Sequence, residues 1–248
     1  MDEPRLRVQR DVVSYVRRSA RMNPSQLKAW TELQHWVVPV PRRETSTSVA
    51  PDARVDWAAV FGRAAPLVVE IGGGTGDVIA GIAAQHPERN HIAVEVFEPA
   101  VASTLSKCRR AGVDNVRVVI ANGVDALATL IDDHGLTELW TFFPDPWHKK
   151  RHHKRRLVST AFADLVVRKL SPDGCWRLAT DWTDYAEAMR DVLDAHPGLV
   201  NRYDGWAPRW QDRPQSRYEL KGVAAGRTIH DLCYGVRQGT IPSKGGAR

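Results

Sequence analysis

The sequence predicts a doubly wound α/β domain built on a mostly parallel sheet and preceded by an N-terminal helical arm. From residue 66 onward, short apolar runs alternate with stretches of helical length, a pattern typical of a parallel sheet covered on both faces. A glycine-rich turn follows the first apolar run, as in nucleotide-binding sheets. We expect strands at 67–71, 91–96, 116–121, 139–143, 175–179 and 229–236, and helices at 78–85, 99–111, 124–133, 157–170 and 185–195.

Residues 1–55 are expected to form a partly flexible N-terminal region, and residues 56–248 the main domain. Six arginines by residue 21 and little apolar surface predict a mobile arm over residues 1–22. Asn23 and Pro24 are residue types favoured at a helix cap and at the first helical position, so a helix is expected to begin there and to end before Pro39. The Ser, Thr and Pro content of residues 42–52 predicts a linker.

The composition is that of an ordinary globular chain, with 43% hydrophobic and 26% charged residues among 248. No apolar run approaches the roughly 20 residues that span a bilayer, and no apolar signal segment follows Met1, so we expect a cytoplasmic protein without a membrane partner. Cys108, Cys175 and Cys233 are far apart, which argues against disulfides and a thiolate metal site. We therefore expect no metal.

One segment holds the whole net positive charge of the chain. The chain has 35 Lys and Arg against 29 Asp and Glu, and removing the six cations of residues 149–156 leaves 29 of each sign. A solvated helix face is the ordinary interpretation of such a run. Because this run follows a carboxylate at a strand end and contains no acidic residue, we favour a phosphate-binding surface for nucleic acid. Its cations are Lys149, Lys150, Arg151, Lys154, Arg155 and Arg156.

A rigid turn carries the carboxylate that precedes this run. Asp145 lies between Pro144 and Pro146, whose rings fix the backbone, directly after an apolar strand. Functional groups are commonly placed on such loops. Trp147 follows, and its ring has two interpretations: simple packing, or stacking on a base.

The glycine-rich turn after the first strand favours one class of cofactor. A dinucleotide fingerprint requires glycine where Asp77 stands, which disfavours a nicotinamide dehydrogenase. A tight turn without a ligand is the structural alternative. The pattern Glu-x-Gly-x-Gly-x-Gly instead resembles the first motif of class I S-adenosylmethionine-dependent methyltransferases, which have a Rossmann-like fold. Its residues are Glu70, Gly72, Gly74 and Gly76.

Polar residues also follow the next three strands of the predicted sheet. Glu95, Asn122 and Asp145 end the second, third and fourth strands, and parallel strands bring such ends together at the switch point. There Glu95 can accept hydrogen bonds from ribose hydroxyls, Asn122 can contact the adenine edge, and Asp145 lies over the methyl position. Each alone is more often a strand-end cap than a ligand. Together they predict a site for S-adenosylmethionine.

With these residues, the chain from about Tyr15 to the last strand resembles the bacterial tRNA (guanine-N7-)-methyltransferase family. The resemblance rests on Phe143-Pro-Asp-Pro-Trp147 with the basic run, on Ala179-Thr-Asp-Trp-Thr-Asp-Tyr185, and on Ser216-Arg-Tyr-Glu219 followed by Gly226 and Asp231. It implies methyl transfer from S-adenosylmethionine to N7 of a guanosine in the tRNA variable loop. It also implies cofactor binding by Glu70, Glu95, Asn122 and Asp145, catalysis at Asp145, and substrate contacts by Lys149, Asp181, Ser216, Arg217, Tyr218 and Glu219.

The chain departs from the family pattern at a few positions. His148 stands where the family usually has proline, and His230 where it usually has an aromatic residue. The family's Thr-Lys-Phe-Glu is Ser-Arg-Tyr-Glu here, which preserves a hydroxyl, a cation, an aromatic ring and a carboxylate. These changes remove no polar group that the chemistry requires.

The implied reaction needs no general base, because guanine N7 carries an exposed lone pair and no proton. Positioning supplies the acceleration, and Asp145 can stabilise the positive charge that develops on the base. Asp181 and Glu219 are candidates to accept hydrogen bonds from guanine N1-H and N2-H₂, although Asp181 is equally an N-cap candidate. Two other functions stay open: an exocyclic-amine methyltransferase, whose motif has a second proline that this chain lacks, and an inactive RNA-binding protein on the same fold.

Overall fold

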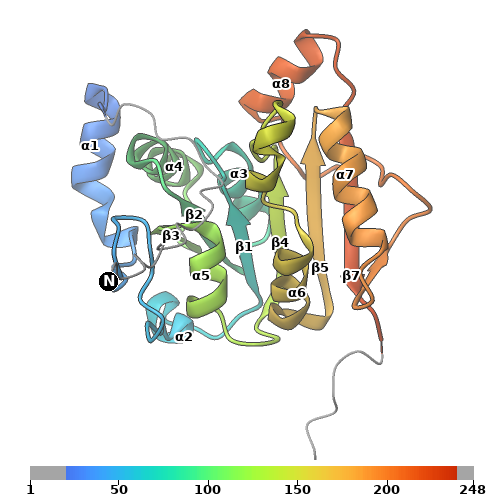
Figure 1. The fold of residues 1–248 in the computed structure, drawn as a ribbon. Coiled ribbons are helices and arrows are strands. Elements are labelled where there is room, and N and C mark those ends of the chain that lie inside the picture. Colours follow the sequence, from blue (N-terminus) through green and yellow to red (C-terminus); the bar gives the residue numbers. More distant parts are fainter. Residues whose placement is uncertain (1–20, 239–248) are drawn as a thin grey trace, which may run out of the picture.

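The computed structural model describes residues 21–238 as a seven-stranded sheet flanked by helices (Figure 1). The strands lie in the order β3-β2-β1-β4-β5-β7-β6; the first five run parallel, and β7 pairs antiparallel with both β5 and β6. This arrangement confirms the predicted doubly wound, mostly parallel sheet. The strands are β1 (Leu67–Ile71), β2 (Asn90–Glu95), β3 (Val116–Ile120), β4 (Leu136–Phe142), β5 (Leu170–Thr180), β6 (Leu199–Asn201) and β7 (His230–Val236).

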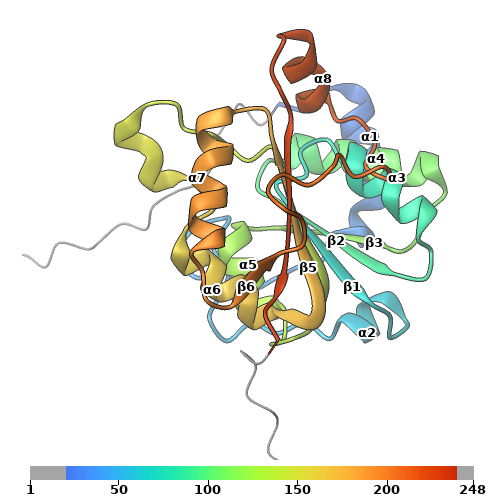
Figure 2. The same cartoon turned by 90° about the vertical axis from the view of Figure 1, so that its right-hand side faces the viewer.

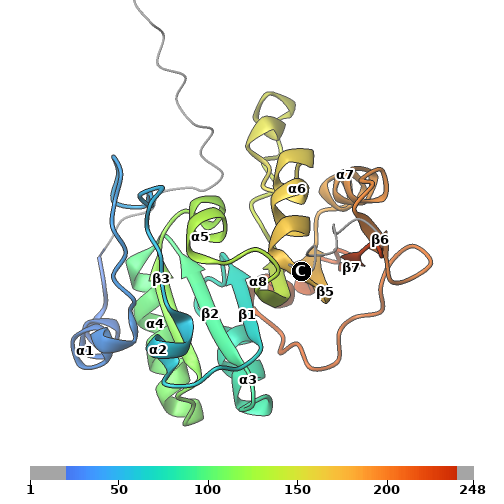
Figure 3. The ribbon, with the colours of Figure 1, turned by 90° about the horizontal axis from the view of Figure 1, so that it is seen from below.

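Helices cover both faces of this sheet, as Figure 3 shows from below. Side chains of α1, α3 and α4 pack on one face, and those of α5, α6 and α7 on the other. Because both faces are covered, every residue of β1 is buried and the strand is apolar except for Glu70. The helices are α1 (Pro24–Leu33), α2 (Trp57–Phe61), α3 (Asp77–Gln85), α4 (Glu98–Ala111), α5 (Gly123–Leu130), α6 (Thr160–Lys169), α7 (Thr183–Asp194) and α8 (Arg217–Ala224), with short 3₁₀ helices η1 (Gln34–Trp36) and η2 (Lys150–Arg155).

The predicted elements are present, and a few differ in extent. The first helix begins at the predicted cap, where the Asn23 side chain accepts a hydrogen bond from the Gln26 amide at 2.9 Å. β5 begins earlier than expected, because the predicted turn at 172–174 is an irregularity inside the strand: its pairing with β4 shifts between Leu136 and Glu138. The elements α2, α8 and β6 are additions to those that the sequence predicts.

Residues 42–52 are packed on the main domain, unlike the linker that their composition predicts. Thr47, Ser48 and Val49 are buried, and the Thr47 carbonyl accepts a hydrogen bond from the Asn122 amide at 2.6 Å. The segment forms neither a helix nor a strand, and the Ser48 hydroxyl accepts hydrogen bonds from backbone amides of the same segment. The predicted mobile arm lies almost entirely in residues 1–20, outside the described residues.

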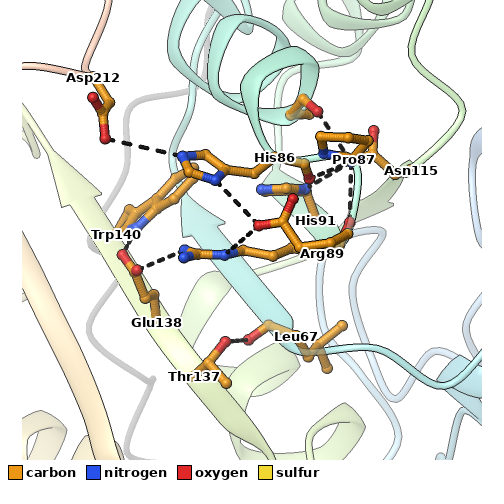
Figure 4. Close-up of polar contacts among 12 residues, drawn as sticks. Leu67, His86, Pro87, Arg89, His91, Asn115, Thr137, Glu138, Trp140 and Asp212 are labelled. Atoms are coloured by element: carbon orange, nitrogen blue, oxygen red, sulfur yellow. Dashed lines mark hydrogen bonds and ion pairs between the residues drawn. The ribbon is translucent and has the colours of Figure 1, made fainter.

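A polar cluster ties the amino half of β4 to its neighbours (Figure 4). Glu138 accepts hydrogen bonds from Arg89 at 2.9 Å and from the Trp140 indole at 2.8 Å, as Figure 4 shows. It also accepts one from Arg177 at 3.0 Å. Burial alone would raise the pKa of Glu138, but the Trp140 hydrogen bond and the arginine charges outweigh it and lower the pKa. This end of β4 is therefore fixed by charge as well as by packing. Within residues 21–238, no helix has the length and apolarity to cross a bilayer.

Candidate active site

A cleft of about 410 Å³ lies where the parallel strands end at their carboxyl edge. Its walls come from the turns after β1, β2, β3 and β4 and from α8, so the strand-end residues that the sequence singles out do converge. Asn122 itself is absent from the lining, but both of its neighbours contribute to it. Predicted site residues in the lining are Gly72, Gly74, Glu95, Asp145, Ser216, Arg217 and Tyr218.

The glycine-rich turn forms one wall, and its shape depends on glycine. Gly72, Gly74 and Gly76 all have positive φ, at 74°, 56° and 75°. At Gly76 there is also no room for a side chain, because an added Cβ would lie 2.5 Å from the Thr104 hydroxyl on α4. The turn therefore lies directly against α4.

Glu70 lies beneath this turn and does not line the cleft. Its side chain is 1% exposed, and a Cβ on Gly73 would come within 2.7 Å of one carboxylate oxygen, Oε2. Within the described residues this oxygen has no hydrogen-bond partner. Burial, with the nearby charges of Glu95 and Asp77, raises the pKa of Glu70 to about 8. The carboxyl group is thus mostly protonated at neutral pH.

Glu95 joins the first turn to the second. One carboxylate oxygen accepts the Gly74 amide at 3.1 Å, and the other accepts the amides of Val96 and Phe97 at 2.8 and 3.0 Å. Burial raises the pKa of Glu95 and the charge of Asp145 adds to this effect, whereas the three amide bonds oppose it. The oxygen that accepts only the Gly74 amide keeps a free lone pair, so Glu95 can still accept a hydrogen bond from a ligand.

Asn122 acts as a helix cap in this structure. Its side-chain oxygen accepts hydrogen bonds from the amides of Val124 at 2.8 Å and Asp125 at 3.4 Å, which caps α5. Its neighbours Ala121 and Gly123 line the cleft, whereas Asn122 does not. The strand-end position of Asn122 predicts such a cap as the alternative to a ligand contact.

Asp145 stands at the mouth of the cleft on a turn with unusual backbone geometry. Phe143 and Trp147 have φ values of 52° and 47°, and in the described residues His134 alone shares positive φ among non-glycine residues. Bulky residues in this region store strain, which is common at functional sites. The turn therefore fixes where the exposed Asp145 side chain is presented.

Trp147 and His148 are used in packing next to this turn. The Arg155 guanidinium lies 4.9 Å from the centre of the Trp147 ring, and His152 meets the ring edge at 5.9 Å. This contact supports the packing interpretation of Trp147. The His148 ring lies 4.1 Å from that of Trp182, so the residue that replaces the usual proline packs against the turn after β5.

The basic run forms η2, which projects from the body of the protein beside the cleft edge (Figure 2). Its cations are not equivalent. Arg156 is engaged inside the protein, because it donates to the Pro146 carbonyl at 2.9 Å and pairs with Asp184. Arg155 covers Trp147. The exposed members are Lys149, Lys150, Arg151 and Lys154.

Comparison with known proteins places this site in a family. Residues 64–232 match the family described as "Putative methyltransferase". A tRNA (guanine-N(7)-)-methyltransferase of Cutibacterium acnes is 56% identical over 232 residues, which cover 92% of this chain and 84% of that protein. The chain belongs to the tRNA (guanine-N(7)-)-methyltransferase family. A further member, from Nocardioides sp., is 46% identical over 91% of this chain and 87% of that protein.

Solved structures with low sequence identity to this chain share its fold. The 16S rRNA methyltransferase KamB aligns with a TM-score of 0.54 over 79% of this chain and 97% of that chain, at 15% identity. A 30S ribosomal methyltransferase from an uncultured bacterium aligns with a TM-score of 0.51 over 81% of this chain and 100% of that chain, at 11% identity. At these identities the likeness concerns the fold alone.

The family's Ser-Arg-Tyr-Glu segment forms the start of α8, and its members point in different directions. Ser216 caps the helix by accepting the Glu219 amide at 3.2 Å, while Arg217 and Tyr218 face the cleft. A Cβ on Gly74 would touch the Tyr218 ring at 3.4 Å. Glu219 turns inward, where it is buried and pairs with Arg209 at 2.6 Å.

Asp181 lies beside α8 and does not cap α7. The N-cap of α7 is Trp182, without a side-chain cap bond, so the capping interpretation of Asp181 is wrong. Asp181 accepts a hydrogen bond from Arg227 at 2.8 Å, and a Cβ on Gly222 would come within 2.8 Å of its side chain. His230, the second departure from the family pattern, packs at 4.7 Å against the Trp206 ring.

Three residues of this region are not among the site residues predicted from the sequence. Lys221 and Asp77 line the cleft, and Asp77 is paired with Lys107. Arg213 is fully buried behind α8. A signal for α8 does exist, because Ser216 followed three residues later by Glu219 is the capping-box pattern. In residues 21–238, no group of three His, Cys, Asp or Glu side chains is arranged to hold a metal.

Proposed function

We propose that this chain transfers a methyl group from S-adenosylmethionine to N7 of a guanosine in the variable loop of tRNA. The observation that carries the proposal is Asp145: it stands on a strained turn at the mouth of the cleft, between the glycine-rich turn and the exposed cations of η2. A cofactor-sized cleft and a polyanion-binding surface thus meet at one carboxylate.

The lining of the cleft fits S-adenosylmethionine in size and chemistry. A volume of about 410 Å³ is in the range of small-molecule sites, and Ile71, Val94 and Phe97 supply apolar surface for an adenine ring. Carboxylates on one side and Arg217 with Lys221 on the other match a ligand that has cationic groups and a carboxylate. When bound, the cofactor supplies an electrophilic methyl group on a sulfonium.

Residues on the sheet side of the cleft each contact a different part of the cofactor. Glu95 accepts hydrogen bonds from ribose hydroxyls, and the amide group of Asn122 contacts the adenine edge. Gly72, Gly74 and Gly76 allow the backbone to approach the ligand closely. Glu70 acts from beneath, by supporting the turn.

Asp145 acts at the reacting centre. The guanine N7 lone pair attacks without a base, so the protein has only to align the two reactants and exclude alternative poses. The base becomes cationic as the bond forms, and the carboxylate of Asp145 stabilises that charge. Asp181 accepts a hydrogen bond from the Watson–Crick edge of guanine with the oxygen that Arg227 does not hold. The buried position of Glu219 favours an indirect role for that residue.

The exposed cations hold the RNA. Lys149, Lys150, Arg151 and Lys154 are exposed at and just before η2, and they bind backbone phosphates without reading sequence. This places the variable loop beside Asp145 while the cofactor occupies the opposite side of the cleft.

The test is incubation with bulk tRNA and methyl-labelled S-adenosylmethionine, followed by nucleoside analysis. We expect label in 7-methylguanosine, lost in Asp145→Ala and retained in Asp173→Ala, which removes another exposed aspartate, in the irregular first part of β5. Label in a methylated exocyclic amine would show the alternative methyltransferase activity. Absence of label with tRNA still bound would show an RNA-binding protein on this fold.

A further inference from the structure

The helix that forms one wall of the cleft has almost no apolar anchor. Of the eight residues of α8, only Glu219 and Gly222 are buried. Its larger apolar side chains are about half exposed, with Tyr218 48%, Leu220 50% and Val223 53% exposed. A helix normally docks through an apolar stripe, so another interaction must hold α8 against the domain.

That interaction is a buried chain of charges centred on Arg213, whose side chain is 0% exposed. Its guanidinium binds both oxygens of Asp231 on β7, with one bond at 3.1 Å, and reaches Glu219 on α8 at 3.4 Å. Arg209 adds a second cation on Glu219 and also donates to the Arg213 carbonyl at 2.7 Å. One side chain therefore links the helix to the sheet.

The same guanidinium contacts the strand end that presents Asp145. Its central carbon lies 5.0 Å from the ring centre of Phe142 and 5.8 Å from that of Phe143. Phe143 is one of the two strained residues that flank the Pro-Asp-Pro turn. Arg213 thus touches the two structures that must be in register for catalysis: the helix that carries Arg217 and Tyr218, and the base of the Asp145 turn.

We propose that Arg213 is a positioning residue that couples α8 to the Asp145 turn, and that Glu219 acts through it rather than on the base. This inference rests on the proposed function, because register between the two walls matters only if cofactor and RNA meet there. Burial raises the pKa of Asp231, and the hydrogen bonds and charge of Arg213 oppose that rise. Removing the arginine would leave the buried Asp231 without its cation and Glu219 with Arg209 alone.

Two conservative variants separate positioning from general stability. Arg213→Lys keeps a positive charge but cannot bridge Asp231 and Glu219 with a planar fork or cover both phenyl rings. Glu219→Gln keeps the shape of the helix end and removes its charge. The matched control is Lys169→Met, which removes another buried cation, paired with the exposed Asp133 at 2.8 Å, on α6 and away from α8.

Limited trypsin digestion of the free protein measures the opening of α8, because Arg217 and Lys221 are cleavage sites within the helix. We expect cleavage there to be about tenfold faster in Arg213→Lys and Glu219→Gln, and kcat at saturating cofactor and tRNA to fall about tenfold. Lys169→Met should leave both quantities at the wild-type level.

Wild-type rates of α8 cleavage and wild-type kcat in both variants would overturn the inference. The proposed function fails on a different result, namely wild-type protein that places no label in 7-methylguanosine. The protease comparison uses no substrate, so the two failures are distinguishable.

Discussion

The two walls of the cleft are held in place differently. The sheet wall, which carries the glycine-rich turn, directly follows the fully buried strand β1. The opposite wall, α8, is held against the domain by ion pairs. All five residues of β1 are buried, but only two of the eight residues of α8 are. Apolar packing involves many small contacts and gives one arrangement, while an ion-pair chain depends on a few groups. We infer that the cofactor wall is preformed and that α8 is the element able to move during binding.

The two walls also differ in charge. Glu95 and Asp145 belong to the sheet side, and Arg217 and Lys221 to α8, with the cations of η2 beyond them. Negative charge thus lies where the sulfonium and the developing guanine cation are expected, and positive charge where a carboxylate or phosphates are expected. The separation gives each wall its own test.

The largest effect is expected at the carboxylate between the walls. Asp145→Asn keeps the shape of the side chain and removes its charge, so kcat should fall by about 100-fold while cofactor affinity changes little. Single-turnover methylation and calorimetric titration with S-adenosylhomocysteine measure the two effects. A loss of cofactor affinity as large as the loss of rate would show that Asp145 binds the cofactor and does not act on the reacting base.

The exposed cations should control RNA binding alone. Replacing Lys149, Lys150, Arg151 and Lys154 by glutamine should weaken tRNA binding by tenfold or more at moderate salt and reduce the slope of log K against log salt by about 3. Arg156→Met is the matched comparison, because Arg156 is already paired with Asp184. An equal change of slope in Arg156→Met would contradict this division of roles.

The preformed wall can be tested with a pair of glycines. Gly76→Ala places a Cβ 2.5 Å from Thr104, whereas Gly72→Ala meets nothing within 4 Å; both positions have positive φ. Gly72→Ala should therefore lower the unfolding free energy by about 1 kcal/mol, and Gly76→Ala by distinctly more. Urea unfolding of the two variants measures the difference. Equal losses would mean that the turn is looser than its contact with α4 indicates.

Glu70 makes the sheet wall sensitive to pH. Its pKa rises from 4.5 to about 8 on folding, so the folded protein keeps a proton that the unfolded chain releases. The stability that this proton contributes is complete below pH 4.5 and is lost as the pH rises through 8. Between pH 5 and 8, the unfolding free energy of the wild type should fall relative to that of Glu70→Gln by roughly 1 kcal/mol per pH unit. Parallel curves for the two proteins would contradict the buried, protonated state.

The sheet wall could be predicted from sequence because its signals are local. An apolar run, a glycine spacing and two prolines around Asp145 each define their own structure. The predicted residues Glu95 and Asp145 accordingly line the cleft. The depth of Glu70 has no such signal, because a carboxylate at a strand end looks the same in sequence whether it lines a cleft or lies beneath a turn.

The α8 wall could not be predicted in the same way, because its determinants are distant in sequence. Glu219 resembles a substrate contact until Arg209 and Arg213 are seen to enclose it. Arg156 resembles the other cations of its run, and its partner Asp184 lies 28 residues later. Composition describes how much charge a segment holds, and only the fold shows which charges are already paired.

Amide hydrogen exchange of the wild-type protein tests the contrast between the two walls most directly. We predict that the amides of α8 exchange through local opening, far faster than those of β1 and β4, and that S-adenosylhomocysteine slows exchange in α8 while leaving the sheet unchanged. Exchange in α8 as slow as in β1, with or without ligand, would contradict the claim that this wall of the cleft is held by ion pairs and able to move.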